Sequence, residues 1–323
     1  MQQPSSSRNA EHQILFRDDL SVDKYCAPKG IGKTTLSKRF DIKVLEEAIT
    51  NKQTIWHKDC AKHRIFGMSF IHYTPENEMN LVIKTSTVRS ERSPLHKKEF
   101  EEHMELVSNI RGPNVVPVRA YYFSSEDEQR LIVYDNYMEG SVHNMLHGKT
   151  SRPLHWDARL RIAIGVAKGL KQIHAQDNGK LVHGNIKSPN IFLNTKKFGC
   201  ISDLGQSILF PPVLHSGRID RQAHKHLAPE IQGEHDFKKT LQSADIYSYG
   251  TLLVELLYGE INISFCSGGF SSVRDNHLRE LFNGMEKQWE CMNQIAKDCT
   301  SEDPSKRPKI DAVVTNLEKI SRA

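Results

Sequence analysis

Short apolar runs separated by polar turns characterise the chain from residue 41 onward. The runs 80–84 (NLVIK) and 130–137 (RLIVYDNY) are rich in β-branched and aromatic residues, which predicts strands. Between them, segment 96–110 (HKKEFEEHMELVSNI) places apolar residues three and four positions apart, with charged residues on the other faces. We therefore expect a small sheet accompanied by one amphipathic helix.

The pattern becomes mainly helical after Gly140. Three long segments carry apolar residues at helical spacing, namely 156–175, 243–259 and 286–300. A strand-rich region followed by a helix-rich region predicts an α+β protein with two lobes. We expect a small antiparallel β lobe with one helix, joined near residues 135–140 to a larger, mainly α-helical lobe.

Residues 1–40 differ in composition and in hydrophobic pattern from the rest of the chain. They are polar, rich in serine at the start and basic near Lys38 and Arg39, with little periodic apolar pattern. We interpret them as a flexible polar lead-in. The folded domain is then expected at 41–323, with lobes at about 41–137 and about 138–323.

One stretch of this lead-in nearly matches a phosphate-binding P-loop. Residues 27–35 (APKGIGKTT) follow the pattern GxxxxGK[ST], which requires a preceding strand and a following helix. Ala27 takes the place of the first glycine, and the preceding SVDKY is a poor buried strand. A solvated basic loop is favoured, and a P-loop nucleotide hydrolase using Lys33 is kept as the less favoured alternative.

Composition narrows the class of protein. The 323 residues are 38% apolar, which is enough to bury one large core or two adjoining lobes. The net charge of +5 is not concentrated in a long basic run, which argues against nucleic acid as a partner. Six cysteines without a CxxC pair fit a reducing compartment. Because no apolar run approaches the roughly 18 residues of a membrane span, we expect a soluble cytoplasmic chain without a direct membrane span.

Seven short motifs occur in a characteristic order. Along the chain they are LVIK, LIVYDNYMEGSV, HGNIKSPN, SDLG, APE, SADIYSYG and CTSEDPSKRP. Each motif alone is weak, but their order and approximate spacing resemble those of a protein kinase domain. The sequences VHGNIKSPNIFLN, ISDLG and EDPSKRP are most similar to the corresponding motifs in the intracellular domains of plant leucine-rich-repeat receptor-like kinases. The resemblance covers about residues 41–323, so the chain is expected to be either a cytoplasmic relative or a fragment of such a receptor.

The resemblance implies ATP and Mg²⁺ as cofactors. Lys84 matches the strand lysine that holds the α and β phosphates, and Asn190 and Asp203 match the two metal-binding positions. Asn185 occupies the position of the catalytic aspartate. Lys187 lies two residues further along the same loop and is counted with the catalytic residues.

The resemblance also places an adenine pocket between the lobes. Tyr134 falls where access behind this pocket is controlled, and Asp135 and Tyr137 belong to the hinge whose backbone groups read adenine. Val82 replaces the alanine above the adenine ring, and Phe192 lies below it. These two residues either are ordinary core residues or narrow the pocket, and both interpretations stay open.

Two departures from the family pattern concern the chemistry directly. Asn185 is a neutral amide and cannot accept a proton at physiological pH, and losing a general base typically costs about 10²- to 10⁴-fold in rate. Aligning residues 62–67 (KHRIFG) with GxGxxG keeps Gly67 but puts Lys62 and Arg64 where glycine lets the backbone approach the phosphates. Both changes predict a kinase that is inactive or severely weakened.

Two further departures affect regulation. His103 stands where a helix glutamate pairs with Lys84, and Glu99, one turn earlier, is the only nearby substitute. Gly184 replaces the arginine that pairs with a phosphorylated activation loop, and residues 206–227 contain neither Thr nor Tyr. Both replacements are also common in close relatives of this group, so inheritance without consequence is the alternative.

Other positions match supports of the fold. By the same resemblance, Asp245 pins the catalytic loop and Glu230 pairs with Arg307 in the helical lobe. His143 and His147 have the i, i+4 spacing of a metal-binding pair, but no third ligand stands near them in the sequence. We therefore interpret these histidines as solvated side chains.

These observations predict an inactive receptor-like protein kinase that serves as a scaffold or regulator in intracellular signalling and retains ATP binding. Its partners would be other signalling proteins, foremost an active receptor-like kinase that holds it at the inner face of the plasma membrane. The alternative is a low-activity Ser/Thr kinase that transfers the γ-phosphate of ATP to protein hydroxyls, drawing on Lys84, Asn190 and Asp203.

Overall fold

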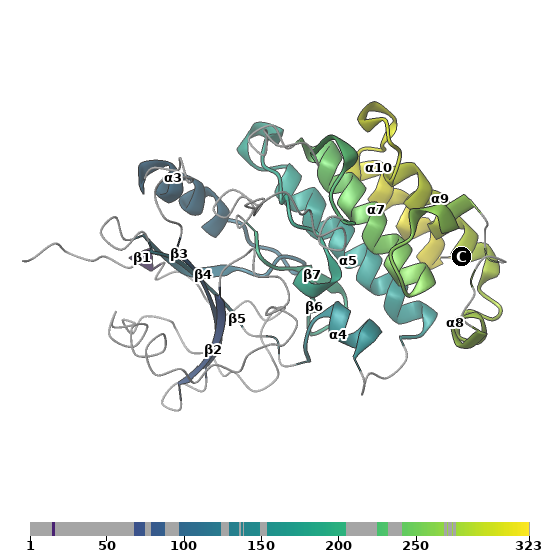
Figure 1. Cartoon of the computed structure of the whole chain (residues 1–323), viewed down its shortest axis with the longest axis horizontal. Helices are drawn as coiled ribbons and strands as arrows, with labels where there is room; N and C mark the ends of the chain where they lie inside the picture. The colour runs from purple at the N-terminus through teal and green to yellow at the C-terminus, as the bar shows by residue number, and fades with distance from the viewer. Residues whose placement is uncertain are drawn as a thin grey trace, which may run out of the picture.

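The computed structural model shows a strand-rich part beside a helix-rich part (Figure 1). The residues that it describes are 15–16, 68–74, 79–87, 97–123, 129–135, 137, 139–148, 154–204, 225–231, 241–267, 270, 273 and 276–322. This arrangement confirms the predicted two-lobe α+β fold.

Within the described residues, five strands form one antiparallel sheet in the order β1, β4, β5, β3, β2. They are β1 (Leu15–Phe16), β2 (Met68–Thr74), β3 (Met79–Thr87), β4 (Val118–Phe123) and β5 (Gln129–Asp135). Both runs predicted as strands lie in the sheet. The two-residue β1, which lies within the expected lead-in, pairs with β4. The remainder of residues 1–40, including the stretch resembling a P-loop, lies outside the described residues.

The predicted amphipathic helix is α3 (Lys97–Ser108). Its apolar face is fully buried through Phe100, Met104 and Val107, and the Phe100 ring meets the edge of Tyr121 in β4 at a centroid distance of 6.0 Å. Since these residues recur every three or four positions, one stripe of the helix covers the sheet.

The helical lobe is built around one central helix. Its helices are α4 (Val142–His147), α5 (Trp156–His174), α7 (Gln242–Tyr258), α8 (Asn276–Leu281), α9 (Glu286–Cys299) and α10 (Ile310–Arg322). Every residue of α7 from Ala244 onward is buried, as expected of a helix surrounded by protein on all sides. In Figure 1 this helix lies among α5, α9 and α10.

A small hairpin of β6 (Ile191–Leu193) and β7 (Gly199–Ile201) packs against α5. A Cβ atom added to Gly165 of α5 would lie 2.3 Å from the backbone nitrogen of Gly199, so only glycine permits this approach. The hairpin follows the loop expected to be catalytic and precedes the SDLG motif. Close packing on α5 therefore places both motifs at the boundary between the lobes.

None of the helices in the described part of the chain combines the length and the apolar character needed to cross a membrane.

Candidate nucleotide and phosphotransfer site

Asp245, on the buried helix α7, anchors the loop that contains Asn185. Its carboxylate accepts hydrogen bonds from the backbone N–H groups of His183 and Gly184, both at 2.7 Å, and contacts the His174 ring at 2.9 Å. Although burial alone would raise the pKa of Asp245, the hydrogen bond from His174 and the nearby histidine charges hold that pKa below its ordinary value. The predicted role of Asp245 as an anchor therefore has direct geometric support.

Gly184 also has a backbone reason to be glycine. Its φ angle of 72° lies in the left-handed region, which glycine adopts without steric cost. Its N–H points to Asp245 in this conformation. The glycine that replaces the usual arginine is thus compatible with a well-formed loop.

His183 connects this loop to the SDLG segment. Its ring is fully buried, and burial lowers its pKa, which favours the neutral imidazole. Its Nδ1 accepts the backbone N–H of Asn185 at 3.2 Å. The ring proton therefore belongs on Nε2, which lies 2.8 Å from the carbonyl oxygen of Ser202.

Asn185 sits in an intact loop. Its N–H is held by His183, and its carbonyl oxygen accepts a hydrogen bond from the side-chain Nδ2 of Asn190 at 3.0 Å. Lys187 belongs to the same turn, where its carbonyl oxygen accepts the N–H of Asn190 at 2.9 Å. The backbone conformation is maintained, so what is lost at position 185 is the carboxylate itself.

The two predicted metal-binding residues lie close together through Ser202. The Ser202 N–H donates to the carbonyl oxygen of Asn190 at 2.9 Å, and the Ser202 hydroxyl donates to the Asp203 carboxylate at 3.1 Å. Both metal-site side chains are buried. Because Asn190 uses its Nδ2 for Asn185, its amide oxygen is the atom left to coordinate a metal, and an amide and a carboxylate oxygen suit Mg²⁺.

Asp203 has a left-handed backbone conformation. Its φ angle of 67° places it in the left-handed region, which residues other than Gly, Asn and Asp seldom adopt. Such conformations persist where the surrounding structure holds them, and they cluster at functional sites. The conformation is consistent with a carboxylate placed for binding a ligand.

The hinge region has a packed and ion-paired framework. Arg119 in β4 makes a bidentate ion pair with Asp135, with nitrogen–oxygen distances of 2.8 and 2.5 Å. Because both carboxylate oxygens of Asp135 bind Arg119, the hydrogen bonds to adenine would come from backbone groups of the hinge. Tyr137 stacks on Phe192 with ring centroids 5.3 Å apart, so Phe192 has a definite packing partner in the hinge.

Tyr134 is buried behind the hinge. Its hydroxyl donates to the carbonyl oxygen of Leu204 at 3.2 Å, which ties β5 to the residue after Asp203. In the sheet, Val82 of β3 lies opposite Tyr134, and Lys84 lies opposite Ile132. The side chain of Lys84 and residues 62–67, with Gly67, Lys62 and Arg64, lie outside the described part, so their predicted roles remain predictions.

His103 is the α3 residue that replaces the expected glutamate. Its ring nitrogen Nε2 is buried and has no hydrogen-bond partner among the described residues. Burial lowers the pKa of His103 from 6.5 to about 4, against an opposing effect of the Asp177 carboxylate. The residue is therefore neutral at physiological pH. Glu99 is exposed, and because the Lys84 side chain lies outside the described residues, the pairing of Glu99 with Lys84 stays a prediction.

The buried state of His103 predicts a pH dependence of stability. The unfolded chain binds a proton below about pH 6.5, whereas the folded chain binds it only near pH 4, so stability falls as pH decreases between these values. When the pH is lowered from 7.5 to 5, the free energy of unfolding of the native protein should fall by about 1 to 2 kcal/mol more than that of the His103→Leu variant. Urea denaturation at both pH values measures this difference, and parallel changes in the two proteins would contradict it.

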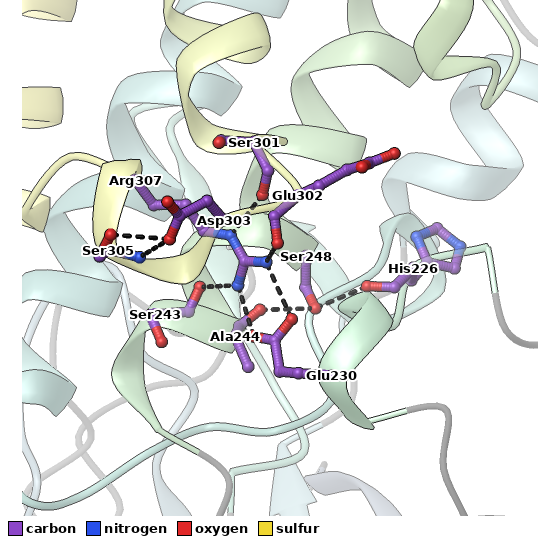
Figure 2. Close-up of polar contacts among 10 residues, drawn as sticks. All are labelled: His226, Glu230, Ser243, Ala244, Ser248, Ser301, Glu302, Asp303, Ser305 and Arg307. Atoms are coloured by element: carbon purple, nitrogen blue, oxygen red, sulfur yellow. Dashed lines mark hydrogen bonds and ion pairs between the residues drawn. The ribbon is translucent and has the colours of Figure 1, made fainter.

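Arg307 and Glu230 form the expected support of the helical lobe (Figure 2). Arg307 contacts both carboxylate oxygens of Glu230, at 2.6 and 2.9 Å, and also donates to the carbonyl oxygens of Ser243 and Ser301. Burial would raise the pKa of Glu230, but its hydrogen bond with Arg307 lowers it overall. The Arg307 side chain is fully buried and that of Glu230 is 34% exposed.

Comparison with known proteins finds a family model and several relatives that match this chain. Residues 64–317 match the family model described as protein tyrosine and serine/threonine kinase. A protein named a probable inactive receptor kinase from Arabidopsis thaliana is 40% identical over 69% of this chain, which spans 37% of that relative's length. A second Arabidopsis thaliana protein, named a probably inactive receptor-like protein kinase, is 36% identical over 76% of this chain and 77% of its own length.

A solved structure supports the fold. The pseudokinase domain of BIR2, described as an immune regulator of the RLK/Pelle family, superposes with a TM-score of 0.66. The match covers 96% of this chain and 90% of that domain at 21% identity. At this identity the likeness concerns the arrangement of the elements.

Proposed function

Since the chain belongs to the protein tyrosine and serine/threonine kinase family, we propose that it is an inactive receptor-like kinase that works as a scaffold or regulator in signalling. The observation that carries the proposal is the replacement of the catalytic carboxylate by Asn185 within a loop whose hydrogen bonds remain intact. A loop that keeps its backbone hydrogen bonds but lacks the catalytic base can still maintain the conformation of a surface that binds a partner protein.

The chemistry would fail for more than one reason. Asn185 cannot take up the proton of an attacking hydroxyl. His103 is buried and neutral where an anion would orient Lys84. The two cationic side chains that replace glycines in the 62–67 segment would in addition hinder the approach of the backbone to the phosphates.

Nucleotide binding is a separate property, and we propose that it is weak and dependent on Mg²⁺. When bound, the metal would neutralise phosphate charge, and Asn190 and Asp203 are the residues that would hold it. Mg-ATP at millimolar concentration should raise the melting temperature of the native protein but not that of Asp203→Asn. Identical melting curves with and without the nucleotide in both proteins would contradict this prediction.

The low-activity Ser/Thr kinase stays as a second candidate because one observation favours it. Asp203 keeps a left-handed conformation and is connected to Asn190 through Ser202, an arrangement suited to positioning a metal. In that case Asn185 would orient a substrate hydroxyl without removing its proton.

The partner would be an active receptor-like kinase or its substrate, bound through the folded two-lobe surface at the inner face of the plasma membrane. This assignment rests on the inactive site together with the similarity to receptor-like kinases. The two candidate functions differ in whether signalling requires the residues of the nucleotide site.

Complementation of a line that lacks the protein tests the proposal. Lys84→Ala and Asp203→Asn, expressed at the level of the native protein, should restore signalling and retain partner binding. Loss of signalling in Asp203→Asn, with normal protein abundance and normal partner binding, would mean that signalling requires the nucleotide site and would contradict a scaffold that works through its folded surface alone.

A further inference from the structure

A second cluster of chemically active side chains includes neither Asn185 nor Asp203, although one member, Ser188, lies in the turn that contains Asn190. We call it the α4–α7 cluster, and it consists of His143 and His147 on α4, Glu255 on α7 and Ser188 in the turn Ser188–Asn190. The Glu255 Oε1 atom lies 2.8 Å from His147 Nε2, 2.8 Å from Ser188 Oγ and 3.8 Å from His143 Nδ1. Thus a carboxylate 108 residues further along the chain than His147 supplies the third ligand that the local sequence lacks.

Glu255 is only partly satisfied in this cluster. It is 2% exposed, and its second oxygen, Oε2, has no hydrogen-bond partner among the described residues. A buried carboxylate oxygen without a partner is costly, and such atoms commonly mark an absent ion or water. The other oxygen of Glu255, Oε1, lies close to both imidazole rings and accepts the Ser188 hydroxyl.

The geometry suits a transition metal. With zinc–ligand distances of about 2.0 to 2.2 Å, ligand atoms at tetrahedral positions lie about 3.3 Å apart. The separations of 2.8 and 3.8 Å from Glu255 Oε1 to the two imidazole nitrogens lie on either side of this value. The imidazole rings are close to each other, with centroids 4.6 Å apart.

The exposure of the cluster allows an ion to enter. The side chains of His143 and His147 are 35% and 33% exposed, whereas the Glu255 side chain is 3% exposed. An ion could thus reach the imidazoles from solvent and contact a buried anion. Two imidazole nitrogens with one carboxylate oxygen are ligands for Zn²⁺ and its neighbours, whereas Mg²⁺ and Ca²⁺ prefer oxygen donors alone.

We propose that His143, His147 and Glu255 bind a divalent transition-metal ion, with Zn²⁺ as the best match to these ligands. Solvent would provide the fourth ligand at the exposed side of the imidazoles. Ser188, whose hydroxyl donates to Glu255 at 2.8 Å, is the residue that would orient the carboxylate.

Such an ion would connect three elements that the chain brings together only on folding. The helix α4 directly follows the hinge, α7 is the central helix, and Ser188 is two residues before Asn190. The metal would therefore hold the catalytic-type loop and the segment after the hinge in a fixed relation. This role is independent of phosphotransfer and adds a ligand-dependent element to the proposed scaffold.

The test is a calorimetric titration of the full chain with Zn²⁺, after complete removal of metals. All proteins carry Cys291→Ser, because Cys291 is an exposed thiol that could bind zinc by itself. We expect the native cluster to bind one equivalent at micromolar or lower concentration. His143→Ala, and separately His147→Gln, should weaken this binding about 100-fold or more, since even residues that only support a metal ligand commonly cost 10- to 100-fold.

Two controls keep the result interpretable. His155→Ala removes an exposed histidine at the start of α5 and should bind as the native protein does. His147→Gln keeps a side chain able to hydrogen-bond Glu255, so its metal-free melting temperature shows that the fold is intact. Hydrogen exchange should slow on addition of Zn²⁺ in residues 141–148 of the native protein and not in His143→Ala.

Three outcomes would overturn the proposal. They are binding only at millimolar Zn²⁺, equal affinity in His143→Ala and the native protein, and protection from exchange that appears elsewhere than in α4.

Discussion

Arg307→Ala should lower the free energy of unfolding by about 3 kcal/mol, the lower end of the range observed when one partner of a buried ion pair is removed, because Glu230 is 34% exposed and stays partly hydrated. The side chain is fully buried and donates to both oxygens of Glu230 and to the carbonyl oxygens of Ser243 and Ser301. Removing it leaves several acceptors without a donor. Since domains are typically stable by about 5 to 15 kcal/mol, much of the protein should be unfolded or degraded. Urea denaturation of the purified variant measures the loss.

A matched control separates this effect from the removal of any arginine. Arg322 on α10 is 78% exposed and lies 3.7 Å from Glu318, a surface contact that contributes little. Arg322→Ala should therefore unfold close to the native concentration of urea. Arg307→Lys should be intermediate, because lysine keeps the charge but cannot form the planar, bidentate contact with Glu230. Equal stability of Arg307→Ala and Arg322→Ala would contradict the supporting role of this pair.

The consequence for function follows from the proposed scaffold. If the folded surface binds the partner, Arg307→Ala should reduce partner binding in proportion to the loss of folded protein. Lys84→Ala leaves the packed helical lobe unchanged and should retain binding. Comparing Arg307→Ala with Lys84→Ala thus shows whether partner binding depends on the stability of the fold or on the nucleotide site.

The elements of the site could be predicted because local motifs lie on elements with strong periodic patterns. The helical spacing of Phe100, Met104 and Val107 determines the buried face of α3, and the motif order places Asn190 and Asp203 on either side of one short hairpin. Asp245 could be assigned as an anchor only through the resemblance of its motif to that of the family, and the structure places this motif at the start of a long buried helix.

Long-range contacts could not be predicted in this way. Asp135 is paired with Arg119 across neighbouring strands, and an arginine in a strand pattern does not identify its partner. Glu255 joins His143 and His147 only because folding brings this residue of α7 against α4. The two residues of β1 are too few to carry a periodic pattern. Each case depends on tertiary packing that no short window of sequence contains.

Purified protein with Mg-ATP should show no phosphotransfer above background, and Asn185→Asp alone should not restore it. The backbone at position 185 is already held by His183 and Asn190, so an aspartate there would gain a correctly placed carboxylate. A base by itself can contribute about 10²- to 10⁴-fold. Phosphoryl transfer depends mainly on positioning and on charge stabilisation of the phosphate, and a neutral His103 leaves Lys84 without its anionic partner.

Incorporation of labelled phosphate, measured for the native protein and for Asn185→Asp, checks this expectation. Each protein is paired with its Lys84→Ala counterpart, which reports any contaminating kinase. Adding His103→Glu to Asn185→Asp would restore both missing carboxylates, so a signal that appears only in this double variant would show that positioning is limiting. Strong autophosphorylation of the native protein that disappears in Lys84→Ala would instead identify a working kinase, because no contaminant depends on that lysine.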